Sequence, residues 1–520
     1  MSMSYLTDPF TPPEYPEHPQ PRPRRHRDDD RDIADSQYEN TGREETRNEE
    51  TRDKGARNKS TQHDDADGHG RSHRGDAQAS GEARATLTGK DADDVGTYAD
   101  DADDTPGQVA VASGEDISTE TTPVEVLTEP RDGIPDVVVD EHTLMEAAAA
   151  LRAGSGPFAI DAERASGYRY GQRAYLVQVR REGAGTWLID PIACPDLSPI
   201  NDAVEGVEWI LHAATQDLGC LREVGLHPTT LFDTELGARL VGLPRVGLAA
   251  VIEHYLGFSL AKEHSAVDWS TRPLPEDWLR YAALDVECLA EVRDAMAADL
   301  ESQGKAEWAR QEFEALTSFT GHAVRTDPWR RVSGLRRLRT PRMAAIVREL
   351  WYARDDLARK RDTSPGRVAP DAVLVALSTA APTTDAAAAS ASSHKVVRRN
   401  PEIWSAAVRR ALDLPVSQLP PTSVPSQGPP PPKSWADRDP VAAARLAMAR
   451  EELSTFAEAH RIPLENLLSP DTLRRAIWEP PTDLSEAGAE ASLLDLGARP
   501  WQAQIAAPVL ARVFSEASEA

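Results

Sequence analysis

The sequence is poor in cysteine and in aromatic residues, and it has no long apolar run. Its 520 residues include three cysteines, Cys194, Cys220 and Cys288, and no two of them have the spacing of a zinc or redox motif. We therefore expect neither a disulfide scaffold nor a zinc ribbon, and a reducing cytoplasm is the natural compartment. The sequence has no uninterrupted run of about 18 apolar residues, which a membrane-spanning helix would need. The first residues lack the basic and apolar regions of a secretory signal.

The formal net charge of -27 is unevenly distributed along the chain. Residues 1–140 hold 16 Lys+Arg against 34 Asp+Glu, a net charge of -18, and the remainder holds 42 against 51, a net charge of -9. Residues 1–133 are rich in proline and charge and cannot build a core, so we expect a disordered acidic tail. On composition alone, that tail could also be an arm that competes with an anionic ligand for a basic surface, or an interaction scaffold.

Residues 134–320 show the alternation of strands and helices that is typical of an α/β domain. Three short apolar segments bounded by glycine and proline follow one another closely, which predicts antiparallel neighbours in one sheet. We expect these strands at 158–160, 175–179 and 186–189, and a fourth at 209–212. Helical patterns cover 141–152, 215–224, 233–241, 248–256 and one long segment, 275–303.

After residue 320 we predict helices, interrupted by a loop and a linker. Residues 321–370 carry 13 Lys+Arg against 5 Asp+Glu, a local charge of +8 that suits a phosphate backbone or, alternatively, a solvated helix face. Residues 379–393 read as a loop. We predict one helical domain over 325–415, a Pro-rich linker over 416–434 and a second small helical domain over 435–520.

Two acids stand at the end of the first strand of the α/β domain, in Pro157-Phe-Ala-Ile-Asp161-Ala-Glu163. Residues i and i+2 of a strand point to the same face, so Asp161 and Glu163 would present both carboxylates to one point. Alone, such a pair is more often a solvated strand end. It gains meaning only if further acids converge on the same point.

Two later segments supply such acids. Asp217 stands at the first turn of a helix that is entered from a strand, where the helix dipole alone would favour an acid. Tyr281 and Asp285 are spaced i,i+4, on one face of the long predicted helix. Hard divalent cations prefer oxygen ligands, and two of them about 4 Å apart can clamp the attacking and leaving oxygens of a phosphodiester. Four carboxylates would hold them, and the tyrosine hydroxyl could position a water.

These motifs resemble the ribonuclease D family, in the tyrosine subclass of the DEDD 3′-5′ exonucleases, over roughly residues 136–415. The segments Phe232-Asp-Thr234 and Asp268-Trp-Ser-Thr-Arg-Pro-Leu274 are similar to further family signatures. The basic module, with Arg359-Lys-Arg-Asp-Thr-Ser-Pro-Gly-Arg367, resembles the HRDC domain that follows the nuclease in this family. The last module would be a second, more divergent copy.

The resemblance implies a ribonuclease H-like exonuclease domain, in which a mixed sheet is flanked by helices, followed by two small all-α HRDC-like domains. It implies that Tyr281 orients or helps to deprotonate the attacking water, and that nucleoside 5′-monophosphates are released from the 3′ end of RNA such as tRNA precursors. The family commonly has threonine before the glutamate and an aromatic residue after it, whereas Ala162 and Arg164 flank Glu163 here. The implied ligands of two Mg²⁺ or Mn²⁺ ions are Asp161, Glu163, Asp217 and Asp285.

Other residues and other functions stay open at this point. Lys262 and Arg272 could bind substrate phosphates, although a solvated lysine and a structural arginine are nearly as plausible. The same site could act on DNA, because sequence does not place the contacts that would sense a 2′-hydroxyl. A non-catalytic nucleic-acid binding protein is a further alternative, which the complete set of acids disfavours. We expect no membrane association and no obligate protein partner.

Overall fold

The computed structural model describes residues 125–261, 266–321, 325–335, 338–422 and 428–516. Most of the predicted tail, residues 1–124, lies outside the described residues. Residues 125–133 do not belong to a tail: strand β1 (Glu125–Leu127) pairs in parallel with β8 (Phe258–Leu260), and the sequence pattern predicted neither strand. Within the described part of the chain, no helix combines the length and the apolar character that crossing a membrane requires.

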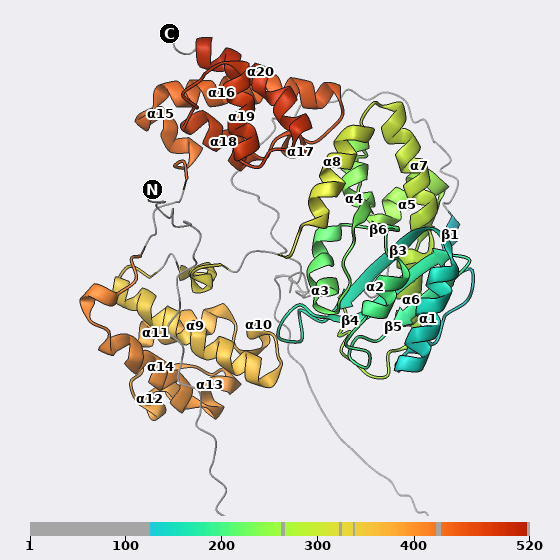
Figure 1. Cartoon of the computed structure of the whole chain (residues 1–520). Coiled ribbons are helices and arrows are strands. Elements are labelled where there is room, and N and C mark those ends of the chain that lie inside the picture. Colours follow the sequence, from blue (N-terminus) through green and yellow to red (C-terminus); the bar gives the residue numbers. More distant parts are fainter. Residues whose placement is uncertain (1–124, 262–265, 322–324, 336–337, 423–427, 517–520) are drawn as a thin grey trace, which may run out of the picture. The chain divides into compact units, whose positions relative to one another are not determined.

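A six-stranded mixed sheet forms the centre of the first domain (Figure 1). Its strands are β2 (Val137–Val138), β3 (Ser155–Arg164), β4 (Ala174–Glu182), β5 (Gly185–Ile189), β6 (Glu208–Leu211) and β7 (Thr230–Asp233), in the order β2-β5-β4-β3-β6-β7. The pairs β3/β4 and β4/β5 are antiparallel, as the closely spaced strands predicted, and the other pairs are parallel. The expected α/β class is confirmed.

Helices cover both faces of this sheet, and β3 shows which residues face which helices. Phe158, Ile160 and Ala162 pack in one core with α1 (Glu141–Ala153), α2 (Ser198–Ala203) and α3 (Leu218–Glu223). Ala159 contacts the opposite layer, formed by α6 (Glu276–Glu287) and α7 (Leu289–Ser302). Because side chains alternate along a strand, the odd-numbered residues after Ala159 also face α6.

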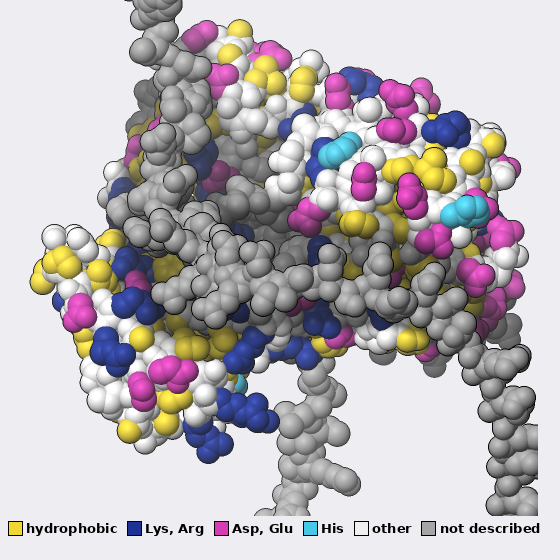
Figure 2. Space-filling view, turned by 60° about the horizontal axis from the view of Figure 1, so that its bottom comes forward, with side chains coloured by type: hydrophobic (Ala, Val, Ile, Leu, Met, Phe, Trp, Pro, Cys, Tyr) yellow, Lys and Arg dark blue, Asp and Glu magenta, His cyan; other side chains and the backbone are white. Residues whose placement is uncertain are grey.

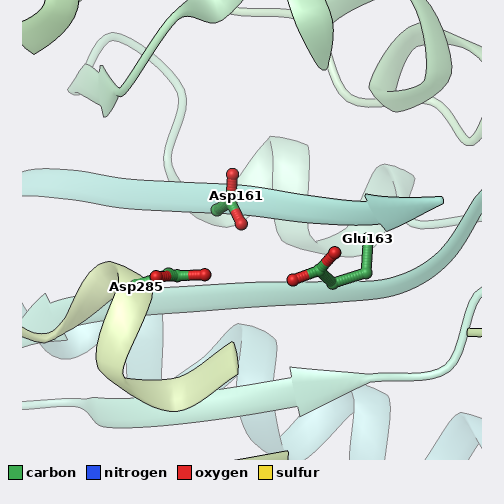
Figure 3. A group of neighbouring side chains, drawn as sticks. All are labelled: Asp161, Glu163 and Asp285. Carbon is green, nitrogen blue, oxygen red and sulfur yellow. The ribbon is translucent and has the colours of Figure 1, made fainter. Parts of the chain in front are cut away.

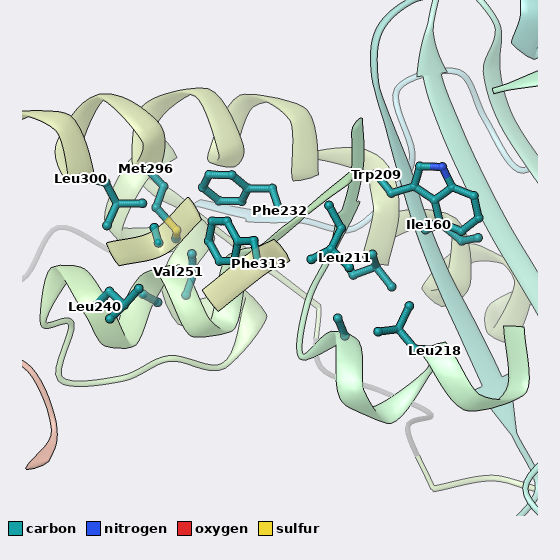
Figure 4. Packing of buried hydrophobic residues seen from close by; sticks show 14 of the residues in the cluster. Ile160, Trp209, Leu211, Leu218, Phe232, Leu240, Val251, Met296, Leu300 and Phe313 are labelled. Carbon is teal, nitrogen blue, oxygen red and sulfur yellow. The ribbon is translucent and has the colours of Figure 1, made fainter. Parts of the chain in front are cut away.

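The far end of the domain is closed by α4 (Thr234–Val241), α5 (Leu248–Leu256) and α8 (Ala306–Thr317). The rings of Phe232 and Phe313 are 4.6 Å apart there, and Met296 and Leu240 pack around them (Figure 4). Aromatic pairs at such distances stabilise a core beyond their buried area. This packing fixes β7 at the edge of the sheet.

The long helix predicted for residues 275–303 is wrong in one respect, because it is two helices. Cys288 has φ -112° and ψ 6°, outside the helical region, and separates α6 from α7. No glycine or proline marks this break in the sequence. Because of this break, α6 packs on the sheet as a separate helix. It contacts β3, β4 and β5, and it also contacts α7.

The helices after residue 340 form two groups (Figure 1). Residues 379–393 are not a loop as predicted, because Thr384 caps a short helix by accepting a hydrogen bond from the Ala387 N–H, and the alanines that follow are strong helix formers.

The first group of helices contains α9 (Pro341–Arg361), α10 (Pro365–Val368), α11 (Asp371–Ala380), α12 (Asp385–Ala391), α13 (Lys395–Arg399) and α14 (Pro401–Asp413). The second contains α15 (Trp435–Arg438), α16 (Pro440–Ala459), α17 (Leu464–Leu467), α18 (Pro470–Trp478), α19 (Glu486–Asp495) and α20 (Pro500–Glu516).

Candidate active site

Three carboxylates meet between β3 and α6. Asp161 and Glu163 are odd-numbered residues of β3 and project toward α6, where Asp285 faces them (Figure 3). Each of these three side chains offers a carboxylate oxygen, and the three oxygens lie within 4.8 Å of one another. The i,i+2 geometry expected for the first two acids is therefore realised, and α6 supplies the third from a segment more than a hundred residues later.

Tyr281 lies one turn before Asp285 on α6. Its phenol forms a side-chain hydrogen bond with the Asp285 carboxylate. Burial is the main cause that raises the pKa of Tyr281, and the charges of Asp285, Glu163 and Asp161 act in the same direction. The hydroxyl is thus placed at the edge of the carboxylate group, as the i,i+4 spacing predicted.

Asp217 joins this group through Asp161. It follows β6 at the junction of a 3₁₀ turn (Ala214–Gln216) and α3, only 4 % exposed, and its carboxyl group is hydrogen-bonded to that of Asp161. Asp217 is not among the three acids whose oxygens all lie within 4.8 Å of one another. Asp161 therefore links the acids: it lies in the group with Glu163 and Asp285 and is also hydrogen-bonded to Asp217.

The turn that carries Asp217 is held by Asp233. The sequence analysis placed Asp233 in a segment similar to a family signature and predicted no role for it. The turn begins at Ala213, which has φ 60° and ψ 53°, a left-handed conformation that disfavours a side chain. The buried Asp233 carboxylate accepts hydrogen bonds from the Ala213 and Ala214 N–H groups, at 3.1 and 2.8 Å, and from the Glu235 and Leu236 N–H groups at the start of α4. One carboxylate thus caps α4 and fixes the turn before Asp217.

Gln178 is a second residue whose contribution the sequence did not reveal. It lies directly opposite Asp161 in the β3/β4 pair, is fully buried, and donates from Nε2 to Asp161 Oδ2 at 2.6 Å. Its Oε1 has no hydrogen-bond partner among the described residues. The amide can therefore orient Asp161, and a glutamine within the buried stretch 174–179 of β4 was the signal that could have indicated this.

The four acids lie buried and close together, an arrangement that a bound cation would stabilise. Burial raises the pKa of Glu163, Asp217 and Asp285 well above the usual values, and the charge of Asp161 raises each of them further. Burial likewise raises the pKa of Asp161. Carboxylates this close repel one another unless positive charge lies between them. An all-oxygen donor set of this charge fits hard divalent cations.

Arg164 is the basic side chain next to these acids. Its Nη1 donates to the Gln216 carbonyl oxygen at 2.7 Å, and its Nη2 lies 3.4 Å from Asp217 Oδ1. The β3/β4 register shifts between Glu163 and Arg164, and such an irregularity redirects side chains. The residue after Glu163 therefore contacts the turn that carries Asp217.

The two predicted phosphate contacts stay predictions. Lys262 lies outside the described residues. The Arg272 guanidinium forms a bidentate ion pair with Asp190, at 2.7 and 2.9 Å, and also donates to carbonyl oxygens, among them that of Tyr175 at 2.7 Å. Its donors are thus engaged within the domain, which favours a structural role. His212 is half-buried, with its Nδ1 2.9 Å from the Thr234 hydroxyl, and Trp269 is fully buried.

Family models match three parts of the chain. Residues 136–301 match the model described as 3′-5′ exonuclease, and residues 343–406 match the HRDC domain. Residues 428–514 match the 3′ to 5′ exonuclease C-terminal domain.

The chain is also similar to individual proteins. It is 30% identical over 320 residues to the ribonuclease D of Pseudomonas paraeruginosa, covering 60% of this chain and 83% of that protein. It is 28% identical over 366 residues to the ribonuclease D of Gluconacetobacter diazotrophicus, covering 68% and 89%. Among solved structures, a protein from Bifidobacterium adolescentis matches at 39% identity with a TM-score of 0.69, covering 75% of this chain and all of that one. The Escherichia coli RNase D, an exoribonuclease involved in structured RNA processing, matches at 25% identity with a TM-score of 0.56, covering 73% of this chain and 98% of that one.

Proposed function

Because the chain belongs to the ribonuclease D family of 3′-5′ exonucleases, we propose that its four clustered acids and Tyr281 remove nucleotides one at a time from the 3′ end of RNA. The natural substrate would be a structured RNA such as a tRNA precursor, because the Escherichia coli relative is involved in structured RNA processing. The products would be nucleoside 5′-monophosphates. The observation that carries the proposal is the group formed by Asp161, Glu163 and Asp285, with Asp217 from a third segment hydrogen-bonded to Asp161.

The activity of this family depends on divalent metal, and we assign the ligands to these four acids. Asp161 would be shared, with Glu163 and Asp285 holding one Mg²⁺ or Mn²⁺ and Asp217 contributing to a second. Two such cations supply Lewis-acid stabilisation of the attacking and leaving oxygens. The fit rests on the carboxylate oxygens of Asp161, Glu163 and Asp285, which lie within 4.8 Å of one another, and the raised pKa values of the acids support it, because a cation would relieve their mutual repulsion.

Two further residues at the site would orient the attacking water and the metal ligand Asp161. Tyr281, anchored to Asp285, would hold the attacking water by hydrogen bonding to it. Gln178 would keep Asp161 in the rotamer that faces both neighbouring groups. Protein groups that lie behind metal ligands and orient them commonly change metal affinity or activity when they are replaced.

We further assign residues 134–320 to the exonuclease domain, 325–415 to the HRDC domain and 435–520 to the second helical domain, joined by the linker 416–434. The HRDC domain would bind the RNA backbone through exposed cations at the end of α9 and along α13. Figure 2 shows Lys and Arg side chains gathered at the lower left of the view. The exposed cations are Arg359, Lys360, Arg361, Lys395, Arg398 and Arg399.

The test is a cleavage assay on 5′-labelled RNA and DNA oligonucleotides with the same 3′-terminal sequence. With Mn²⁺ the wild type should shorten the RNA in single-nucleotide steps and release mononucleotides. Asp285→Asn should abolish this, whereas Asp202→Asn, at an exposed acid of the same domain, should not. Faster cleavage of the DNA would redirect the proposal to a DNA exonuclease. No cleavage of either would favour a non-catalytic nucleic-acid binding protein.

A further inference from the structure

Helix α6 carries Tyr281 and Asp285, and the acid at its C-terminal end stands in an unfavourable place. Glu287 lies in the last turn of α6, where the helix dipole disfavours negative charge, and its side chain is 0 % exposed. A buried charge is unfavourable unless it is paired. Exceptions of this kind are expected at functional or strained sites. The partners of Glu287 therefore indicate what this end of α6 is built to do.

Two arginines from separate segments pair with Glu287. Arg180 of β4 places its Nη2 3.4 Å from Glu287 Oε1, and Arg131 places its Nε 3.6 Å from the same oxygen. Arg131 also contacts the break between α6 and α7, where its Nη2 lies 3.9 Å from Cys288 Sγ and its Nη1 forms an ion pair with Glu291. Positive charge at this position suits the C-terminal end of a helix. The two arginines thus offset the buried acid and hold the end of α6.

Arg131 belongs to residues 129–132, which follow β1 and which we call the strap. The strap contacts α6 at two points: Glu129 Oε2 accepts a hydrogen bond from Arg280 Nε at 2.9 Å, and Arg131 pairs with Glu287. Arg280 and Glu287 are seven residues apart, which is about two turns of helix. The strap therefore lies along one face of α6.

Arg180 connects the strap to the sheet. It lies two residues after Gln178 on β4, so its side chain leaves the sheet on the same face, toward α6. Its Nη1 donates to Asp132 Oδ2 of the strap at 2.9 Å and to the Thr186 hydroxyl of β5 at 2.7 Å. One guanidinium thus joins the strap, the sheet and the end of α6.

These contacts fix α6 without contacting the acids of the site directly. Asp285 and Glu287 are two residues apart, so they lie on different faces of the helix. A shift of Glu287 would nevertheless move Asp285 and Tyr281, because all three belong to one continuous helix. Misplacing a catalytic group by about 1 Å can reduce a rate about a hundredfold. The position of α6 on the sheet is therefore a quantity that the reaction depends on.

We propose that the strap clamps α6 on the sheet and thereby sets the positions of Asp285 and Tyr281 for the exonuclease reaction. Arg131 is a positioning residue that acts through Glu287. The inference rests on the proposed function, and it adds to the working site a segment that precedes residues 136–301, which match the exonuclease model.

The test uses variants of the full chain in the RNA cleavage assay, at a temperature at which thermal unfolding shows them to be folded. Arg131→Gln should lower kcat by at least about tenfold and change KM little, as expected when transition-state geometry is lost and substrate binding is kept. Arg131→Lys keeps the positive charge and should retain much more of kcat. Arg310→Gln is the matched control, because it breaks exposed ion pairs on α8 of the same domain and should leave kcat unchanged.

Amide hydrogen exchange without RNA gives a readout that is independent of cleavage. In Arg131→Gln the amides of α6 should exchange faster than in the wild type, whereas those of α1 should be unchanged. Asp132→Asn is a milder variant, because the Asp132 side chain is 59 % exposed. It should change kcat and exchange in the same direction, and it replaces Arg131→Gln if that variant does not fold.

The outcomes separate the inference from the proposed function. An unchanged kcat in folded Arg131→Gln, or in Asp132→Asn if the first variant does not fold, would overturn the inference and leave the proposed function standing. Equal losses in Arg131→Gln and Arg131→Lys would also overturn it, because the charge of Arg131 would then not matter. A wild type that does not cleave RNA would overturn both.

Discussion

Replacing Asp233 with asparagine should detach the second acid of the site without removing any metal ligand. Asp233 Oδ1 accepts three of the four hydrogen bonds and Oδ2 accepts the fourth, from the Ala214 N–H at 2.8 Å. An asparagine would keep its oxygen toward the three donors, because the reverse orientation of the amide would lose three hydrogen bonds instead of one. Its NH₂ group then faces the Ala214 N–H, so the variant disturbs the turn before Asp217 and leaves α4 capped.

The magnitude follows from the burial of Asp233, which is 3 % exposed. A hydrogen bond to a charged group contributes about 1.5–3 kcal/mol, and a buried donor without a partner costs about 1–3 kcal/mol. We therefore expect the free energy of unfolding to fall by about 2–4 kcal/mol by the same values. The left-handed Ala213 favours the displacement of the turn, because its conformation costs roughly 1–2 kcal/mol; this strain is released when the turn relaxes, which offsets part of the loss in stability.

Three measurements separate positioning from simple stability. Asp233→Asn should lower kcat on a labelled RNA by about tenfold to a hundredfold, in the range seen for groups that orient metal ligands, and should weaken only one Mn²⁺ site. Ala213→Gly, added to that variant, should restore part of both losses, because glycine adopts the left-handed conformation freely. Asp140→Asn is the matched control: Asp140 caps α1 by accepting from the Thr143 N–H, so it should cost stability without lowering kcat. A normal kcat in folded Asp233→Asn would show that Asp233 only caps α4.

Three further predictions concern the same domain. Glu163→Gln should raise the thermal midpoint of the metal-free protein at pH 7.5, because burial and neighbouring acids raise the pKa of Glu163 in the folded protein. The contribution of Glu163 to stability is therefore present below about pH 4.3 and is lost as the pH rises through the raised pKa. An unchanged midpoint would contradict this. His212→Gln should reduce by about 3 kcal/mol the fall in the free energy of unfolding between pH 6.5 and pH 4. Burial lowers the pKa of His212 to about 4, so only the unfolded chain binds a proton at His212 in that interval. Urea unfolding at both pH values measures this difference. Gln178→Leu should weaken Mn²⁺ binding by about tenfold or more while changing the free energy of unfolding little, because the Gln178 Oε1 is buried without a partner; calorimetry that finds unchanged affinity would exclude a role in orienting Asp161.

The positions of the acids could be predicted because each depends on local geometry. The pairing of Asp161 with Glu163 needs only the alternation of a strand, and that of Tyr281 with Asp285 needs only one turn of helix. The sequence did not reveal the groups that act across the sheet. The hydrogen bond from Gln178 to Asp161 depends on the β3/β4 register, and the bonds from Asp233 to Ala213 and Ala214 depend on β7 lying beside β6.

The errors in secondary structure have similar causes. The strands β1 and β8 are short, and each exists through its pairing with the other rather than through its own pattern. The break at Cys288 carries no glycine or proline, so only the packing of α6 and α7 on the sheet reveals it. The helix α12 was missed because serines and threonines around an alanine run resemble a loop, whereas Thr384 acts as a cap.

The two departures from the family pattern beside Glu163 have different consequences, and the sheet explains why. Ala162 is an even-numbered residue of β3, 5 % exposed, and packs in the core with α1, α2 and α3, away from the acids. An exchange of threonine for alanine there changes packing and leaves the site's charge unaltered. Arg164 would face the same core by strict alternation, but the register shift after Glu163 accompanies its contact with Gln216 and Asp217. Of the two, only Arg164 alters the charge that a 3′-terminal phosphodiester meets, so any difference in how this chain receives its substrate should map to Arg164 rather than to Ala162.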